Sequence, residues 1–158
     1  MDEKARRLLL QNIPYGLFVV TAQDKGQRNG LTVNWLTQVS FRPPLVAMAI
    51  ARACQNHPLI AKAGRVAIHF LPKTGEALAQ RFVVPTRRTP DKFFGAAVKD
   101  DAGPPILEGV VGVLEGKLVQ KVETIGDHDI FVFEIVDARL DQDGSVLKLA
   151  DTRMTYAG

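Results

Sequence analysis

The sequence predicts a mainly β protein, an antiparallel β-barrel that carries short helices. Short runs of apolar or alternating residues recur along the chain, and turn-forming Gly, Asp, Asn and Pro separate them, as is typical of strands. The connections between these runs are hairpins, short helices or polar loops, without a regular alternation of strand and helix. Strands this apolar would leave edges open to pairing with other chains, so we expect the sheet to close into a barrel.

The chain begins with a predicted helix and two predicted strands. Residues 2–13, DEKARRLLLQNI, place apolar side chains on one side and predict a short amphipathic helix. Residues 17–23, LFVVTAQ, are apolar on both faces and predict a buried strand. The turn DKGQRNG then leads into residues 30–40, GLTVNWLTQVS, which alternate almost strictly and predict one continuous strand.

Two more strands and two helices follow in alternation. They are a strand at 43–51, a helix at 56–64, a strand at 65–71 and a helix at 74–82. The first of these helices has Asn56 or His57 as its predicted N-cap, Pro58 at its first helical position and Gly64 at its end.

A long polar connection and three further strands complete the chain. Residues 83–104 include one turn of helix at 91–94, and a connection of this length in a compact domain tends to be functional. Strands are predicted at 110–122, 129–140 and 145–150, joined by hairpins at IGDHD and DQDG.

Length and composition favour a single globular domain over residues 1–158. Apolar residues make up 46% and charged residues 23%, which is atypical of disordered or membrane-embedded chains. Three consecutive leucines near the start are too few for a signal peptide, so we expect a cytoplasmic protein without membrane contact. The net charge is +3 and the basic clusters are small, which argues against nucleic-acid binding and favours an anionic small molecule.

The cysteine and histidine content argues against a disulfide or a metal site. Cys54 has no second cysteine to pair with, and His57, His69 and His128 show no HxH or HExxH spacing. We expect His69, which alternates within a strand, to be a hydrogen-bonded core residue. The GxGxxG and Walker motifs are both absent, so no Rossmann unit is expected to bind a dinucleotide.

The predicted strand at 30–40 has an unusual polar face. One face carries Leu31, Val33, Trp35, Thr37 and Val39, whereas the other carries Thr32, Asn34, Leu36, Gln38 and Ser40. A strand face that merely contacts water usually carries Lys, Glu or Arg, and this one has no charge. Two interpretations stay open: the row of neutral donors and acceptors binds an uncharged ligand edge, or it faces water or a dimer partner.

The order and the amino-acid sequences of these segments resemble the flavin reductase-like family, whose members are FMN-binding split barrels. The similarity is carried by GLTVNWLTQVSFRPPLVAMAI, a following helix, RVAIHFL, a helix ending in RF, and GDH before an apolar strand. It extends from about Pro14 to Tyr156. The family includes the small reductase components of two-component flavin monooxygenases, so the resemblance implies an antiparallel split β-barrel that binds FMN.

The resemblance also implies which residues contact the cofactor. These are Thr32, Val33, Asn34, Trp35, Leu36, Gln38 and Val39 in the strand, Ala53, Cys54, Gln55, Asn56 and His57 around the helix start, and Pro85 and Thr86 in the long loop. Backbone N–H groups at the helix start would bind the phosphate. Many relatives carry a basic or hydroxyl residue where this chain has Ala-Cys-Gln, so FMN and FAD both stay open. Asn56 and His57 are alternatively plain helix caps, and Arg81, Arg87 and Arg88 are either phosphate partners or surface residues.

His128 of the GDH motif is the candidate catalytic residue. The resemblance implies that it lies near the flavin and the incoming nicotinamide, where a ring flanked by Asp127 and Asp129 would stabilise charge. The alternative is a hairpin residue that packs on a neighbour. Tyr156 matches an aromatic residue that helps to cover the family's pocket.

The implied function is hydride transfer from NAD(P)H to a bound flavin, without a specified preference for NADH or NADPH. The alternative is an FMN-binding protein that stores or senses flavin without NAD(P)H turnover, since Trp35 could fill the space that a nicotinamide needs. The family resemblance further implies a homodimer and a partner that accepts electrons, such as an oxygenase.

Overall fold

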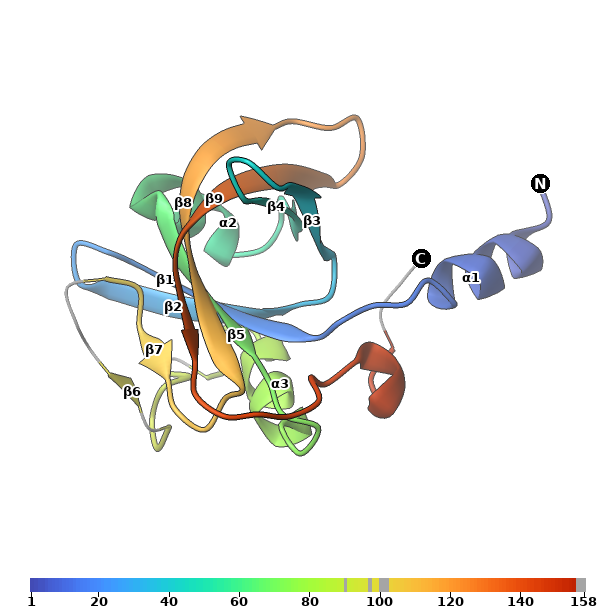
Figure 1. The fold of residues 1–158 in the computed structure, drawn as a ribbon. Helices are drawn as coiled ribbons and strands as arrows, with labels where there is room; N and C mark the ends of the chain where they lie inside the picture. The colour runs from blue at the N-terminus through green and yellow to red at the C-terminus, as the bar shows by residue number, and fades with distance from the viewer. Residues whose placement is uncertain (90, 97, 100–102, 156–158) are drawn as a thin grey trace.

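In a computed structural model of the chain, seven strands form one antiparallel sheet that curls into an open barrel (Figure 1). The structure describes residues 1–89, 91–96, 98–99 and 103–155. The strands of the sheet are β1 (Phe18–Asp24), β2 (Gln27–Val33), β3 (Leu36–Ser40), β4 (Leu45–Ala51), β5 (Arg65–Phe70), β8 (Gly112–Val122) and β9 (His128–Leu140). Their order across the sheet is β2-β1-β5-β8-β9-β4-β3.

Three helices and a second small sheet accompany the barrel. They are α1 (Glu3–Gln11), α2 (Asn56–Ala63), α3 (Glu76–Val83), the 3-10 turn η1 (Leu149–Asp151), and the two-stranded pair β6 (Val98–Lys99) and β7 (Ile106–Leu107). Among the described helices, none has both the length and the apolar content that crossing a membrane requires. The prediction of a mainly β barrel with short helices is therefore confirmed, in its split form.

The barrel is not closed by hydrogen bonds between its edges, in contrast to the expected closed barrel. Strands β2 and β3 form the two edges of the sheet, and Asn34 and Trp35 connect them directly along the chain. The prediction of one continuous strand at 30–40 is thus wrong. Pairing of β2 with β1 ends at Val33, and the Trp35 carbonyl then accepts a hydrogen bond from the Ala49 amide of β4 at 3.0 Å. Beyond this break the expected apolar face is exposed, as at Val39.

Strand β1 is buried on both faces, which explains its continuous apolar run. Val19 packs into one cluster of buried residues with Phe82 of α3, whereas Phe18 and Val20 pack into a second cluster with Phe131 of β9. Strand β5 likewise contributes to both clusters. The predicted buried strand at 17–23 and the predicted strand at 65–71 are confirmed.

His69 is fully buried beside residues of the first cluster and has both ring nitrogens hydrogen-bonded. Nδ1 lies 2.9 Å from the carbonyl oxygen of Val19, and the amide of Leu107 donates to Nε2 at 3.0 Å. The ring therefore carries its proton on Nδ1 and is neutral. Burial lowers the pKa of His69 to about 4, against the smaller opposing effect of the Val19 hydrogen bond. The expected hydrogen-bonded core histidine is confirmed.

Two local predictions are corrected. Helix α2 has Gln55 as its N-cap, so Asn56 and His57 lie inside the helix and do not cap it. Its end at Gly64 is as expected, because this residue adopts a left-handed φ of 64° that suits glycine. Residues 145–150 do not form a strand; they make isolated bridges to Gly16 and Pro72 and then enter η1.

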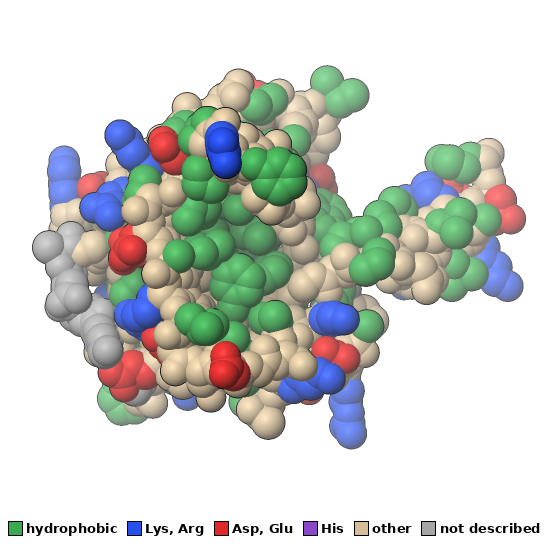
Figure 2. All heavy atoms as spheres, in the orientation of Figure 1, with side chains coloured by type: hydrophobic (Ala, Val, Ile, Leu, Met, Phe, Trp, Pro, Cys, Tyr) green, Lys and Arg blue, Asp and Glu red, His purple; other side chains and the backbone are tan. Residues whose placement is uncertain are grey.

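Helix α1 projects away from the barrel (Figures 1 and 2). The side chain of Asp2 caps its first turn by accepting from the Ala5 amide at 3.0 Å. None of its residues is buried. The predicted helix is confirmed, but its apolar side packs on no part of the described chain.

The buried neutral state of His69 predicts a specific pH dependence of folding. In the unfolded chain, His69 binds a proton with its ordinary pKa of 6.5. In the folded chain it becomes protonated only near pH 4. This contribution to stability is fully present above pH 6.5 and is lost as the pH falls toward 4. We expect the free energy of unfolding to fall by roughly 2 kcal/mol more between pH 7 and pH 5 in wild type than in His69→Gln, by urea titration. Parallel pH profiles for the two proteins would contradict a neutral buried imidazole.

Candidate functional site

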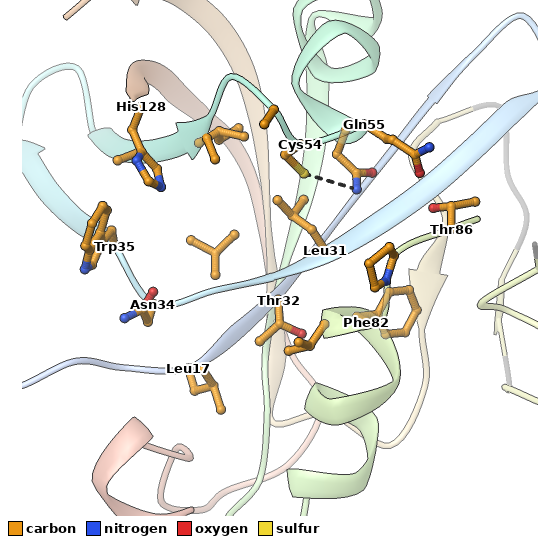
Figure 3. Close-up of a pocket in the computed structure, with 18 of the residues that line it drawn as sticks. Leu17, Leu31, Thr32, Asn34, Trp35, Cys54, Gln55, Phe82, Thr86 and His128 are labelled. Atoms are coloured by element: carbon orange, nitrogen blue, oxygen red, sulfur yellow. Dashed lines mark hydrogen bonds between the residues drawn. The ribbon is translucent and has the colours of Figure 1, made fainter. Parts of the chain in front are cut away.

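A cavity of about 590 Å³ lies beside edge strand β2 and the crossing that follows it. Three segments form its walls: β2 with the crossing at Asn34 and Trp35, the connection from β4 into α2, and the loop after α3 (Figure 3). Its size is that of a pocket for a cofactor-sized molecule. Asn34, Trp35 and His128 lie at one end, and Gln55, Phe82 and Thr86 at the other (Figure 3).

Neutral polar groups line the end near Asn34. Asn34 is 7% exposed, and its Nδ2 has no hydrogen-bond partner among the described residues. Thr32 is already engaged, because its hydroxyl donates to the carbonyl of Ala79 in α3 at 2.6 Å. An orphaned buried amide donor is costly unless a ligand supplies an acceptor, so this end suits a ligand with an uncharged polar edge.

Asn56, in the first turn of α2, has a second orphaned group. Its Nδ2 donates to the carbonyl oxygen of Gly30 at 3.3 Å and lies 3.8 Å from Sγ of Cys54. Its Oδ1 has no partner among the described residues, although the side chain is buried. This acceptor borders the cavity and is available to a hydroxyl group of a ligand.

Lys92 places a buried positive charge on the cavity wall. The residue is 4% exposed, and Nζ donates to the carbonyl oxygens of Gly30 at 2.8 Å and Phe82 at 3.2 Å. No carboxylate in the described part of the chain lies within ion-pair distance of Nζ. Burial lowers the pKa of Lys92, which the nearby Cys54 partly offsets. A buried ammonium without a neutralising anion favours an anionic ligand group at this position.

The loop that carries Lys92 is attached to β2. Asn29 donates to the hydroxyl of Thr86 at 2.8 Å, and the guanidinium of Arg28 lies 4.9 Å from the centre of the Phe93 ring. Phe93 in turn packs edge-to-face on Phe82 with a ring separation of 5.4 Å. These contacts hold the loop beside the cavity.

His128 faces Trp35 at the opposite end. The two ring centres are 4.7 Å apart, and Nδ1 of His128 lies 2.7 Å from a carboxylate oxygen of Asp127. The imidazole therefore has a carboxylate on one side and the cavity on the other. This position allows it to stabilise negative charge that develops on a ligand.

Asp129, the next residue, carries a buried negative charge outside the cavity lining. Arg52 Nε lies 2.8 Å from Oδ1, His57 Nε2 lies 2.9 Å from Oδ2, and Lys121 Nζ lies 3.5 Å from Oδ2. Burial alone would raise the pKa of Asp129, but hydrogen bonds from Arg52 and His57 outweigh it and lower the pKa to about 2.

The structure brings most of the predicted site residues together. Those that line the cavity are Thr32, Val33, Asn34, Trp35, Ala53, Cys54, Gln55, Asn56, Pro85, Thr86 and His128. Arg87 lines it as well, whereas Arg81 donates to the carbonyl of Phe94 elsewhere.

Four predicted residues lie outside this lining. Leu36 lines a separate hollow, Gln38 and Val39 follow the break in the expected strand and are exposed, and His57 turns toward Asp129. The change of strand after Trp35 is the physical reason for the first three. Tyr156 lies outside the described residues.

Lys92 is a site residue that was not predicted from the sequence. Its signal was present as the last residue of the basic cluster TRRTPDK in the long loop, but nothing local distinguishes it from a surface lysine. Leu17 and Met154 of the cavity wall were missed as well.

The chain matches a domain family described as "Flavin reductase like domain" over residues 10–158. It is 32% identical over 149 residues to a flavin reductase from Pseudomonas putida, covering 93% of this chain and 85% of that protein. It is 33% identical to the FMN reductase (NADH) SmoA of Agrobacterium fabrum, over 78% of this chain and 68% of that protein. The solved structure of the flavin reductase HpaC in complex with NADP⁺ superposes with a TM-score of 0.79 at 27% identity, over 95% of this chain and 99% of that one.

Proposed function

Because the chain belongs to the flavin reductase-like family, we propose that it is an NAD(P)H:flavin oxidoreductase whose cavity binds FMN. The observation that carries this proposal is the cavity's polarity: the orphaned Nδ2 of Asn34 at one end and the un-neutralised ammonium of Lys92 at the other. FMN has a matching uncharged polar ring edge and an anionic phosphate.

The spacing of these groups supports an elongated ligand. Lys92 binds the carbonyl of Gly30, and Asn34 follows four residues later along β2 and its continuation. An extended chain rises about 3.3 Å per residue, so the two ends are separated by roughly 13 Å of strand. We therefore propose that Lys92, Thr86 and the start of α2 hold the phosphate, while Asn34 and neighbouring backbone groups bind the ring edge.

When bound, flavin would supply the redox chemistry as the hydride acceptor for NAD(P)H. This chain's residues orient the reactants and set the polarity around them. Asn34 donates to the ring edge through Nδ2, and His128, the candidate catalytic residue, stabilises negative charge at the same end through its imidazole. Leu31, Leu17 and Met154 provide apolar wall that excludes water.

We further propose that residues 1–158 form a single domain and that the reduced flavin passes electrons to an oxygenase or another acceptor. One relative is an FMN reductase that uses NADH, and HpaC has been solved with NADP⁺, so we propose activity with either nicotinamide. The alternative, a flavin-binding protein without turnover, would bind FMN but would not reduce it with NADH or NADPH.

The direct test is spectroscopic. Protein mixed with FMN under anaerobic conditions should bleach near 450 nm when NADH or NADPH is added, because the flavin becomes reduced. Binding of FMN without any bleaching by either nicotinamide would establish the alternative, and no FMN binding at all would refute both.

Lys92 predicts a phosphate-dependent affinity. We expect Lys92→Met to weaken FMN binding roughly 10- to 100-fold, the value of one charge-assisted hydrogen bond, and to change riboflavin binding far less. Quenching of Trp35, the one tryptophan in the sequence, measures both dissociation constants. Lys73→Met, at an exposed position, serves as the matched control. Equal losses for FMN and riboflavin would place the phosphate elsewhere.

We also propose a homodimer, supported by helix α1. Leu8 and Leu9 of α1 are exposed, as is Ile13 just after it, and no residue of the helix is buried. Hydrophobic side chains are visible along the helix in Figure 2. A second hollow of about 460 Å³, lined by Leu36, Ile130 and other mainly apolar residues, lies where α1 joins the barrel. An exposed apolar helix is stabilised when a second copy covers it.

The dimer prediction can be tested within α1 itself. We expect the double variant Leu8→Gln/Leu9→Gln to shift the protein toward monomer in light scattering. The charge-removing double variant Lys4→Gln/Arg7→Gln on the same helix should keep the wild-type mass. A monomeric wild type, or a dimer that both variants leave intact, would remove α1 from the interface.

A further inference from the structure

Asp129 is a buried carboxylate that the proposed chemistry does not use directly. It is 2% exposed and does not line the cavity. Its two oxygens contact Arg52 at 2.8 Å, His57 at 2.9 Å and Lys121 at 3.5 Å. An ionised carboxylate with three basic partners from separate elements is a strong constraint on their relative positions.

Two of these partners bracket the segment that forms one wall of the cavity. Arg52 and His57 stand at either end of Ala53–Asn56, and the four residues between them all line the cavity. Holding both ends on one carboxylate limits how this segment can move. The His57 ring also packs edge-to-face on Phe131 with a centre separation of 5.0 Å, which fixes its orientation.

The same carboxylate lies next to the candidate catalytic residue. Successive side chains of a strand point to opposite faces, so a fixed inward direction of Asp129 directs His128 outward toward the cavity. Arg52 reinforces this arrangement, since its amide donates to the carbonyl of Asp127 at 3.0 Å and its guanidinium donates to the carbonyl of Thr124.

We propose that Asp129 is a positioning residue that holds the Ala53–Asn56 wall and His128 in register with each other. The inference rests on the proposed function, because its consequence is measured as flavin binding and reduction. Asp129 acts through Arg52 and His57 and touches neither cofactor nor nicotinamide.

The test variant is Asp129→Asn, which keeps the shape but removes the charge and half of the acceptor capacity. We expect the dissociation constant for FMN to rise about 10- to 100-fold, as is typical when a supporting partner of a site is removed. Reduction at saturating FMN should slow by a similar factor, because a displaced His128 affects the reaction as well as binding. Trp35 quenching measures the first value, and stopped-flow bleaching by NADH the second.

The matched control is Glu115→Gln on β8, the strand next to β9. It removes an ion pair of 3.2 Å to Arg65 of β5, away from the cavity. It should leave both values unchanged. A merely structural Asp129 would lower the melting temperature of Asp129→Asn while its folded fraction bound FMN normally, and that result would overturn the proposal.

A second variant decides the case if Asp129→Asn fails to fold. Arg52→Gln breaks the 2.8 Å bond but leaves His57 on Asp129, and the half-exposed Arg52 side chain can be replaced without burying a new group. A several-fold weaker FMN affinity supports the proposal, and an unchanged affinity overturns it. Failure of the proposed function is distinguished by the wild type: a wild-type protein that neither binds nor reduces flavin refutes the proposed function and, with it, the role of Asp129.

Discussion

The structure depends on one backbone crossing, in which the chain passes from edge strand β2 to edge strand β3 through Asn34 and Trp35. Neither edge strand hydrogen-bonds to the other, so this two-residue connection is what draws the ends of the sheet together. The bond from the Ala49 amide to the Trp35 carbonyl gives the crossing a fixed partner in β4. The cavity opens beside this crossing, and Asn34 and Trp35 both line it.

The two ends of the cavity differ in charge: one is lined by neutral polar groups and the other by the ammonium of Lys92. Neutral groups at the Asn34 end allow a polar ring edge to be buried without leaving a charge unpaired. At the other end, two carbonyl oxygens stabilise the ammonium of Lys92 but cannot neutralise it. In the proposed binding mode a phosphate completes that charge balance, and the site would gain affinity from the group that distinguishes FMN from riboflavin.

The sequence predicted the elements whose pattern is local. Strands β1 and β5 and helix α3 could be predicted from their apolar runs. The spacing of apolar residues over a few consecutive positions is enough to indicate whether one face or both faces of an element are buried. The break at Trp35 could not be predicted, because the alternation runs through it unchanged and only the bond to Ala49 redirects the chain. Lys92 was missed for a related reason: its burial depends on the Gly30 carbonyl, 62 residues away in the sequence.

The two buried groups with the largest pKa shifts, His69 and Asp129, both lie outside the cavity, whose described lining contains no carboxylate. His69 is neutral because its nitrogens face one acceptor and one donor, and Asp129 is ionised because its oxygens face cations. Neither lines the cavity. A carboxylate there would repel the flavin phosphate and oppose the negative charge that reduction brings to the ring. Asp129 points to the other face of β9 from His128, and Arg52 and Lys121 balance its charge. In the proposed arrangement it therefore holds the wall in place without adding an unpaired negative charge to the cavity.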